Sequence, residues 1–484
     1  MTMRLGISMK ILLLIVIFAF YTHGQDSSST ILFSPTQLKD DLNYLFDNLE
    51  QIHPDLYHYT AKSDIDVLRR EINDSLLEPM TRLDYALKII PLVTALNDGH
   101  TGILLPREER SVALNKGLKI FPILVKIIDG SVYTKTNLSS DSSIVIGSEI
   151  EAINGTSVEL ILNRMRAYYS AELGHFRDIR VAGGFHRLLW YLYGPHDNFV
   201  LEVKNNGRSD TLNLRGITAS EFDAAISNRS HRKTVEPFHF YKTHDNSAGV
   251  IEFNIMYKKS QFRKFLDSTF AVMKSDSIQN LIVDIRKNGG GNSDLIHDLF
   301  DYITDKPYKI FDTTKVKVSK GAKDYVKRNI KWYFYPLAYP VALFVPQARP
   351  YFYMKNGLLS TVTVEKIRKP KVKKAKFKGE TFLLTSHYTF SSANALANSF
   401  KSYNLGTIIG EETGGVLTAY GDIIRFQLPN TKIDGYCSHK VFIHANSKNL
   451  MQGVLPDIPI HQSIDARDMT VDDVMHLIDE RASE

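Results

Sequence analysis

Cysteine is almost absent from this chain of 484 residues, which contains only Cys437. No intramolecular disulfide can form, so the fold must depend on its hydrophobic cores. We interpret Cys437 as a small buried residue rather than a nucleophile, because the sequence implies no basic partner for it.

Several functional motifs are also absent. The sequence has no Walker pattern, no GxGxxG after a strand, no GxSxG elbow and no ligand cluster with zinc spacing. These absences argue against phosphate loops, dinucleotide sites, lipases or esterases, and zinc centres. We therefore expect neither a metal nor another cofactor.

Long apolar runs are missing except at the N-terminus. Residues 11–20 (ILLLIVIFAF) follow Arg4 and Lys10 and precede a polar stretch that begins at Gln25. A run of about ten residues is too short to span a bilayer comfortably. The pattern predicts a signal peptide over residues 1–24, cleaved after Gly24, and export to the periplasm or the extracellular space. An uncleaved anchor is the alternative.

The composition is that of a soluble globular protein of two to three domains, with 43% hydrophobic, 11% aromatic and 23% charged residues. The net charge of +6 is concentrated in the runs 315–331 and 366–378. Such runs are usually solvated surface. The sharper interpretation is peripheral contact with anionic lipid headgroups, or with acidic peptide, through this basic segment. No nucleic-acid-binding module is recognisable, so we expect no nucleic-acid partner.

Residues 381–415 carry the strongest chemical signal. The pattern predicts a strand, a polar turn, a helix that begins at Ser391 and Ser392, and a second strand that ends in a glycine-rich turn. A serine at a strand-to-helix turn lies beside the free N–H groups of the first helical turn, as acyl transfer requires. The alternative is that Ser391 only caps the helix.

Two other segments favour the catalytic interpretation. In LIVDIRKNGGGN (residues 281–292), a buried strand runs into three glycines, so that Gly289 or Gly290 can direct a backbone N–H toward a bound carbonyl. In LNDGHT (residues 96–101), His100 has the side chain best suited to a general base near neutral pH. A single histidine is more often structural.

Together these segments resemble the C-terminal processing (tail-specific) serine peptidase family, in its tricorn and retinoid-binding-protein-like branch. The motifs are DGHT, DIRKNGGGN, FSSANALA, GEETGG and GVLPDIPI, which occur in the family's order. The resemblance implies a serine peptidase with an α/β, crotonase/ClpP-like catalytic domain, a PDZ-like β-rich module and a helical N-terminal region.

The resemblance also implies roles for individual residues. Ser391 falls on the nucleophile, Ser392 on one oxyanion-hole donor, Gly289 or Gly290 on the second, and His100 on the base of tricorn-type members. The sequence departs from the family pattern at three places. Val416 stands where the tail-specific branch has a lysine, Asn394 replaces a glutamate, and the segment 449–452 lacks the tricorn-type glutamate. His100 is thus left with Asp98, Glu411 and Asp457 as candidate orienting groups.

The expected domain organisation follows the change in pattern along the chain. After the signal peptide we expect a helical region (25–112), a PDZ-like module (113–216), a polar connection (217–235), a peptidase domain (236–464) with an aromatic and basic insertion (305–378), and a C-terminal helix (465–484).

The predicted function is hydrolysis of polypeptides through an acyl-enzyme on Ser391, assisted by His100. The alternative is a non-catalytic protein that binds peptides or hydrophobic ligands on the same scaffold. The sequence predicts no particular oligomeric state.

Overall fold

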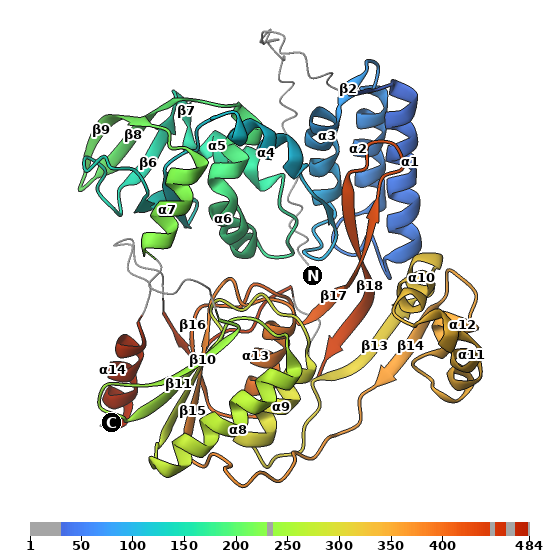
Figure 1. Cartoon of the computed structure of the whole chain (residues 1–484), viewed down its shortest axis with the longest axis vertical. Coiled ribbons are helices and arrows are strands. Elements are labelled where there is room, and N and C mark those ends of the chain that lie inside the picture. The colour runs from blue at the N-terminus through green and yellow to red at the C-terminus, as the bar shows by residue number, and fades with distance from the viewer. Residues whose placement is uncertain (1–30, 230–235, 446–450, 461–469, 483–484) are drawn as a thin grey trace, which may run out of the picture.

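The structure is a computed structural model that describes residues 31–229, 236–445, 451–460 and 470–482. The predicted signal peptide, residues 1–24, lies outside the described residues. Figure 1 shows a lower part built around one sheet and an upper part made of a helical block and a second β-rich unit.

The central sheet confirms the predicted α/β class. Its strand order is β10-β11-β12-β15-β16-β19, with β10 antiparallel to β11 and every other pair parallel. Apolar side chains alternate between its faces. One face packs against α8, α9 and α13, and the opposite face packs against α14. The elements are β10 (Phe238–Lys242), β11 (Ala248–Phe253), α8 (Lys259–Ser275), β12 (Asn280–Asp284), α9 (Asp294–Ile303), β15 (Glu380–Thr385), α13 (Ser392–Ser402), β16 (Thr407–Gly410), β19 (Ile458–Pro459) and α14 (Val471–Ala482).

A second sheet joins distant parts of the chain. Its order is β14-β13-β18-β17, and β18 also pairs with the short strand β3. The segment 305–378 therefore contributes strands to a shared sheet, and its helices form a lobe at the edge of the molecule (Figure 1). The elements are β3 (Gly102–Ile103), β13 (Phe311–Lys317), α10 (Lys320–Arg328), η1 (Trp332–Phe334), α11 (Tyr335–Phe344), α12 (Arg349–Phe352), β14 (Leu359–Val364), β17 (Thr418–Gln427) and β18 (Asp434–His444).

The N-terminal helices pack against the β17–β18 pair, so the start of the chain folds back onto its C-terminal half. Leu45 and Phe46 share one core with Ile424 and Cys437. Buried Asp41 accepts hydrogen bonds from the backbone N–H and the hydroxyl of Thr431. The elements are β1 (Leu32–Phe33), α1 (Pro35–Ile52), α2 (Lys62–Asp74), β2 (Met80–Thr81) and α3 (Arg82–Thr94).

A third sheet, of order β4-β5-β6-β8-β9 with β7 beside β6, fills the upper unit and packs against α5 and α6. Its elements are α4 (Arg107–Asn115), β4 (Ile123–Ile128), β5 (Ser131–Asn137), β6 (Glu149–Ile153), β7 (Thr156–Ser157), α5 (Val158–Arg166), α6 (Gly174–Tyr193), β8 (Asn198–Asn205), β9 (Arg208–Arg215) and α7 (Ala219–Arg229). Within the described residues, no helix is both long and apolar enough to cross a membrane.

One local expectation in this unit is wrong. Residues 144–148 lead into β6 without forming a strand, and they are held by Thr134, whose hydroxyl donates to the carbonyl of Val145 and whose carbonyl accepts the N–H of Gly147. Residues 217–235 are not simply a polar connection, because 219–229 form helix α7. Thr218 and Glu221 make a reciprocal capping arrangement at its start, and Phe222 packs against an apolar cluster.

Candidate active site

Ser391 lies in the turn between strand β15 of the central sheet and helix α13, and it directly precedes the first residue of that helix. Its backbone has φ 54° and ψ −123°, a conformation that L-residues rarely adopt. Its side chain makes no capping hydrogen bond to the helix. Instead, Oγ lies 3.1 Å from Nε2 of His100. The alternative that Ser391 only caps the helix is therefore not supported, because its side chain makes no capping hydrogen bond.

His100 reaches Ser391 because its loop, residues 97–101, is fastened to β18. Ile103 and Gly102 of β3 pair with Gly435 and Tyr436. The imidazole of His100 stacks on the ring of Phe390, with centroids 4.6 Å apart. Two residues 291 positions apart in sequence thus meet through strand pairing and ring stacking.

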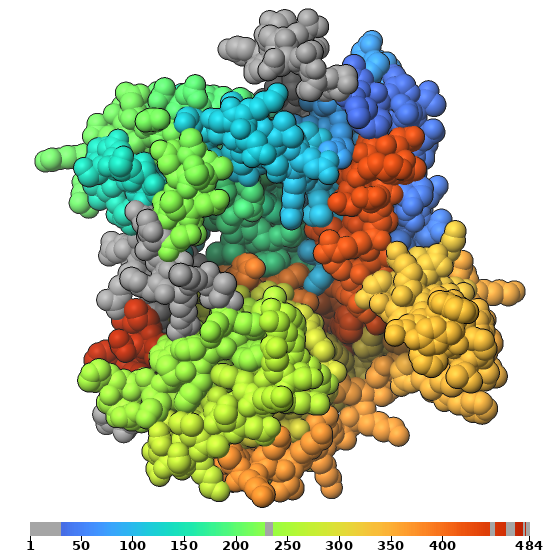
Figure 2. All heavy atoms as spheres, in the orientation of Figure 1, coloured from blue at the N-terminus to red at the C-terminus, as the bar shows by residue number. Residues whose placement is uncertain are grey.

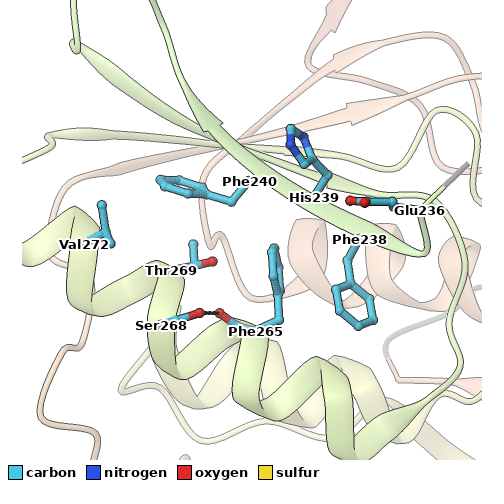
Figure 3. A pocket seen from close by; sticks show the side chains of 8 residues that line it. All are labelled: Glu236, Phe238, His239, Phe240, Phe265, Ser268, Thr269 and Val272. Atoms are coloured by element: carbon cyan, nitrogen blue, oxygen red, sulfur yellow. Dashed lines mark hydrogen bonds between the residues drawn. The ribbon is translucent and has the colours of Figure 1, made fainter. Parts of the chain in front are cut away.

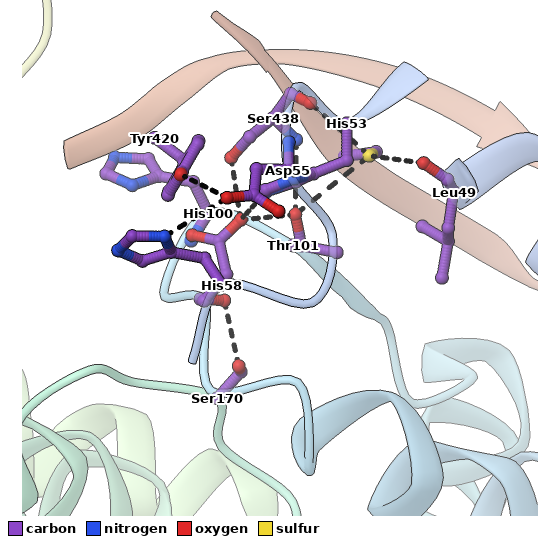
Figure 4. A network of polar contacts seen from close by, with 11 residues as sticks. Leu49, His53, Asp55, His58, His100, Thr101, Ser170, Tyr420 and Ser438 are labelled. Carbon is purple, nitrogen blue, oxygen red and sulfur yellow. Dashed lines mark hydrogen bonds and ion pairs between the residues drawn. The ribbon is translucent and has the colours of Figure 1, made fainter. Parts of the chain in front are cut away.

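Asp98 holds this loop in place through a buried network (Figure 4). Its Oδ2 accepts hydrogen bonds from Thr101 Oγ1 at 2.5 Å and Ser438 Oγ at 2.8 Å, and it pairs with His53 Nε2 at 3.0 Å. Its Oδ1 accepts the backbone N–H of His100. Burial disfavours the charged form, yet His53 and Thr101 outweigh it and lower the pKa of Asp98. The carboxylate therefore binds the His100 backbone rather than its ring.

Glu172 is a second carboxylate at the site, and the sequence interpretation did not include it. One carboxylate oxygen each of Glu172 and Asp98 and one ring nitrogen of His100 all lie within 4.8 Å of one another. Among the described residues, Nδ1 of His100 and Oε2 of Glu172 are both buried without a hydrogen-bond partner. Burial and the neighbouring Asp98 raise the pKa of Glu172 to about 8.

The glycine of the DGHT motif makes this approach possible. A Cβ at Gly99 would lie 2.8 Å from Oε2 of Glu172 and 2.9 Å from the ring of Phe390. Only a residue without a side chain fits between the acid and the ring. Burial lowers the pKa of His100 below its ordinary value, with opposing contributions from Asp98 and Arg180, so the imidazole is neutral near pH 7.

The triple-glycine loop lies against the serine. Gly290 has φ +102°, and a Cβ there would lie 2.7 Å from Cβ of Ser391 and 2.9 Å from the backbone N of Ser392. The N–H of Gly290 donates to Oδ1 of buried Asn288. Within the described part of the chain, the N–H groups of Gly289 and Ser392 donate to no other protein atom.

The departures from the family pattern have structural roles. Asn394 donates to the carbonyl of Val416 and accepts from Oγ1 of Thr413, which ties α13 to the turn that follows β16. Val416 is buried. Glu411 accepts the backbone N–H of His387, and Asp457 accepts that of Ile408, so both of these candidate orienting acids are bonded elsewhere.

The first turn of α6 also contributes to the site without having been predicted. Phe176 stacks on Phe390 with centroids 4.2 Å apart, and His175 packs against His387. A β-rich module was expected over residues 113–216, so this helix was not predicted. Its apolar spacing at Phe176, Val181 and Phe185 was the available signal.

A surface cavity of about 300 Å³ lies elsewhere, between the edge strand β10 and α8 (Figure 3). Its lining includes Phe238, Phe240 and Phe265. β10 is three strands away from β15, or roughly 14 Å at ordinary strand spacing, so this cavity is not next to Ser391.

Comparisons with known proteins agree with this architecture. The model of peptidase family S41 matches residues 247–460. The structure of mature CPAF complexed with lactacystin aligns with a TM-score of 0.62 and 15% identity, covering 92% of this chain and 97% of that chain. Mature CPAF aligns with a TM-score of 0.59 and 15% identity, covering 92% and 96%. At this identity the likeness shows a shared fold. No curated protein matches the sequence significantly.

The family match covers β11 to β19, and hence the serine, the glycine loop and the strands that hold them. It confirms the predicted kinship with the C-terminal processing peptidases. Residues 247–460 thus match peptidase family S41, and this match indicates a serine-type peptidase domain, the kind of hydrolase that acts on polypeptides.

Proposed function

We propose that this protein hydrolyses peptide bonds through an acyl-enzyme on Ser391, with His100 as the general base. The observation that carries the proposal is the 3.1 Å contact between Nε2 of His100 and Oγ of Ser391. In the first step, Nε2 takes the hydroxyl proton while Oγ attacks the substrate carbonyl. His100 then returns the proton to the leaving amine, and water releases the acyl group.

The oxyanion donors in this proposal are the backbone N–H groups of Ser392 and Gly289. Ser392 begins α13, where the helix leaves N–H groups unpaired. Gly289 is preferred over Gly290, because the N–H of Gly290 already donates to Asn288. Val416 cannot exchange a proton, so a Ser–Lys mechanism at that position is excluded.

Glu172 is the proposed orienting acid for His100. When ionised, it accepts the Nδ1 proton and leaves the Nε2 lone pair directed at Ser391. When protonated, it donates to Nδ1 instead and fixes the tautomer that cannot accept the serine proton. This role is supported by two observations: Nδ1 of His100 and Oε2 of Glu172 are both buried without a hydrogen-bond partner in the described part of the chain, and a carboxylate oxygen of Glu172 lies within 4.8 Å of a ring nitrogen of His100.

Export also belongs to the proposal. The charged and apolar start of the chain supports a signal peptide over residues 1–24, which would deliver the peptidase to the periplasm or outside the cell. The turn-rich strand pattern of residues 113–216 likewise supports a PDZ-like module beside the peptidase domain.

The decisive experiment is labelling by a fluorophosphonate probe, which reacts only with an activated serine. We expect the parent chain to be labelled on Ser391, Ser391→Ala to be unlabelled, and His100→Ala to be labelled at least about a hundredfold more slowly. Ser402→Ala, at the end of the same helix, is the matched control and should react like the parent. Labelling that persists in Ser391→Ala would reject the nucleophile, and an unlabelled parent would favour the non-catalytic binding protein.

A further inference from the structure

The lobe formed by α10, η1, α11 and α12 exposes an unusual amount of apolar surface. Phe344 is 85% exposed, Trp332 78% and Leu337 63%. We call the exposed large apolar side chains of this lobe the apolar patch; it consists of Trp332, Tyr333, Phe334, Leu337, Tyr339, Val341, Leu343, Phe344 and Val345. Soluble proteins rarely leave contiguous apolar groups of this size uncovered unless they bind something.

The shape of the patch limits what can cover it. Within α11, Leu337, Val341 and Phe344 follow one helical face, whereas Leu343 is exposed on another, and only Ala342 is buried. A flat protein partner would cover one of these faces. A fluid hydrocarbon phase covers both. At ten residues, or roughly 15 Å, α11 is too short to cross a bilayer and long enough to lie within one leaflet.

The aromatic residues at the start of the patch suit the same environment. Trp332, Tyr333 and Phe334 form η1 directly before α11. Tryptophan and tyrosine combine an apolar body with a polar tip, and they concentrate where hydrocarbon meets headgroups.

The charge of the lobe indicates that the lipid headgroups it contacts are anionic. Residues 325–364 contain no aspartate or glutamate but five cations, namely Lys327, Arg328, Lys331, Arg349 and Lys355. Within the described residues, no ion pair engages these five cations. In the run 366–378, by contrast, four of the eight cations are paired: Arg368 with Asp301, Lys373 with Asp267, and Lys376 and Lys378 with Asp305. The cations beside the apolar patch are therefore not neutralised by an acid in the described part of the chain.

We propose that the apolar patch docks the peptidase on the surface of a membrane that contains anionic lipid. The patch enters the boundary between headgroups and acyl chains, and the neighbouring cations contact the lipid phosphates. The lobe stands out from the body at one side of the molecule, so it can reach a bilayer before the rest of the protein does (Figure 2). The lobe is also attached firmly, because Ala322 and Tyr351 belong to the core of the N-terminal helices.

The chain contains its own reporter, because Trp332 and Trp190 are its only tryptophans. In the full-length Trp190→Phe variant, emission reports on Trp332 alone. With vesicles of phosphatidylcholine and phosphatidylglycerol, we expect a blue shift of this emission and quenching by brominated acyl chains. The matched Trp332→Phe variant, which reports on Trp190 in α6, should show neither change. Because the signal is local, attachment of vesicles by residues 1–24 cannot produce it.

Substitutions in the Trp190→Phe variant separate the contribution of the apolar side chains to membrane binding from that of the cations. Leu337→Ser with Phe344→Ser should reduce Trp332 quenching at a given lipid concentration by at least about tenfold. Lys327→Gln with Lys331→Gln should weaken binding to anionic vesicles by roughly twenty-five-fold, since each cation contributes about fivefold, and should have little effect with pure phosphatidylcholine. Leu160→Ser, at an exposed apolar site of α5, is the control and should change nothing.

Three results would overturn the proposal: absence of quenching with both kinds of vesicle, quenching that persists in the Leu337→Ser, Phe344→Ser variant, or a lipid-free dimer that buries Trp332 and dissociates on the same substitutions. The last result would assign the patch to a second copy of the chain. Unchanged fluorophosphonate labelling of the patch variants would show that each has folded.

Discussion

At the scale of single residues, the proposed nucleophile Ser391 has a strained backbone conformation. Its φ of 54° and ψ of −123° suit glycine, and holding another residue there costs about 1–3 kcal/mol. Ser391→Gly should therefore be more stable than Ser391→Ala by about 1 kcal/mol, after subtracting the greater chain entropy that glycine loses on folding. Urea unfolding of the two variants measures the difference. Equal stabilities would show that the turn is not strained.

The ionisation of Glu172 should control how the activity depends on pH. Its pKa is raised to about 8, mainly by burial and then by Asp98, so the ionised form that orients His100 accumulates only as pH rises through that value. We expect kcat/KM for an unstructured polypeptide to increase through about pH 8. In Glu172→Gln, the increase should disappear and kcat should fall with little change in KM, because an amide keeps the shape but cannot become a carboxylate.

Folding stability should respond to the same proton in the opposite direction. The folded state holds a proton that the unfolded carboxyl releases near its ordinary value, so stability falls as pH rises from that value to about 8. Glu172→Gln should lose this dependence. If Glu172 were merely structural, Glu172→Gln would alter stability and leave the pH profile of kcat/KM in place.

At the scale of secondary-structure elements, strand β18 connects the His100 loop to the C-terminal half of the chain, which contains Ser391. It pairs with β13 and β17 in the C-terminal half and with β3, next to the His100 loop. Ser438 and Thr101 donate to the same oxygen of Asp98, and hydrogen bonds to a buried charge contribute about 1.5–3 kcal/mol.

Ser438→Ala and Thr101→Val should each lower the free energy of unfolding by about 2 kcal/mol, and the double variant by less than the sum, because both groups serve one oxygen. Urea unfolding tests this. The control is Ser399→Ala, since Oγ of Ser399 is buried without a partner among the described residues and its removal should cost little. Full additivity of the two losses would mean that the network does not act as a unit.

Elements with a clear apolar period were predictable from the sequence. The strands around Val283 and Leu383 and the helix after Ser391 occur where the pattern placed them. Helix α7 was not foreseen, although Thr218 and Glu221 carry its capping signature, because the surrounding residues are polar. Glu172 was not foreseen for a different reason. An acid in an irregular segment becomes part of the site only through its packing against Gly99, and no spacing rule conveys that contact.

At the scale of the whole molecule, the meeting of His100 and Ser391 depends on how the N-terminal helices dock. Motif order in the sequence suggested that these residues act together, but it gave no reason for the helices to cover β17 and β18. The reason is the shared core of Leu45, Phe46, Ile424 and Cys437, whose side chains are buried on both sides of the contact. The site should therefore be lost when this docking opens, even if the central sheet stays folded.

The single thiol reports that opening. Cys437 is fully buried within this core, and burial raises its pKa well above the ordinary value, so the native thiol should react with a disulfide reagent several orders of magnitude more slowly than an exposed one. As urea is raised, rapid Cys437 modification and loss of fluorophosphonate labelling should appear over the same concentrations, because both follow separation of the helices from β18. Far-ultraviolet circular dichroism, followed in the same titration, shows whether global unfolding comes later. Serine labelling that persists after Cys437 has become fully reactive would mean that His100 is held at Ser391 by something other than this core.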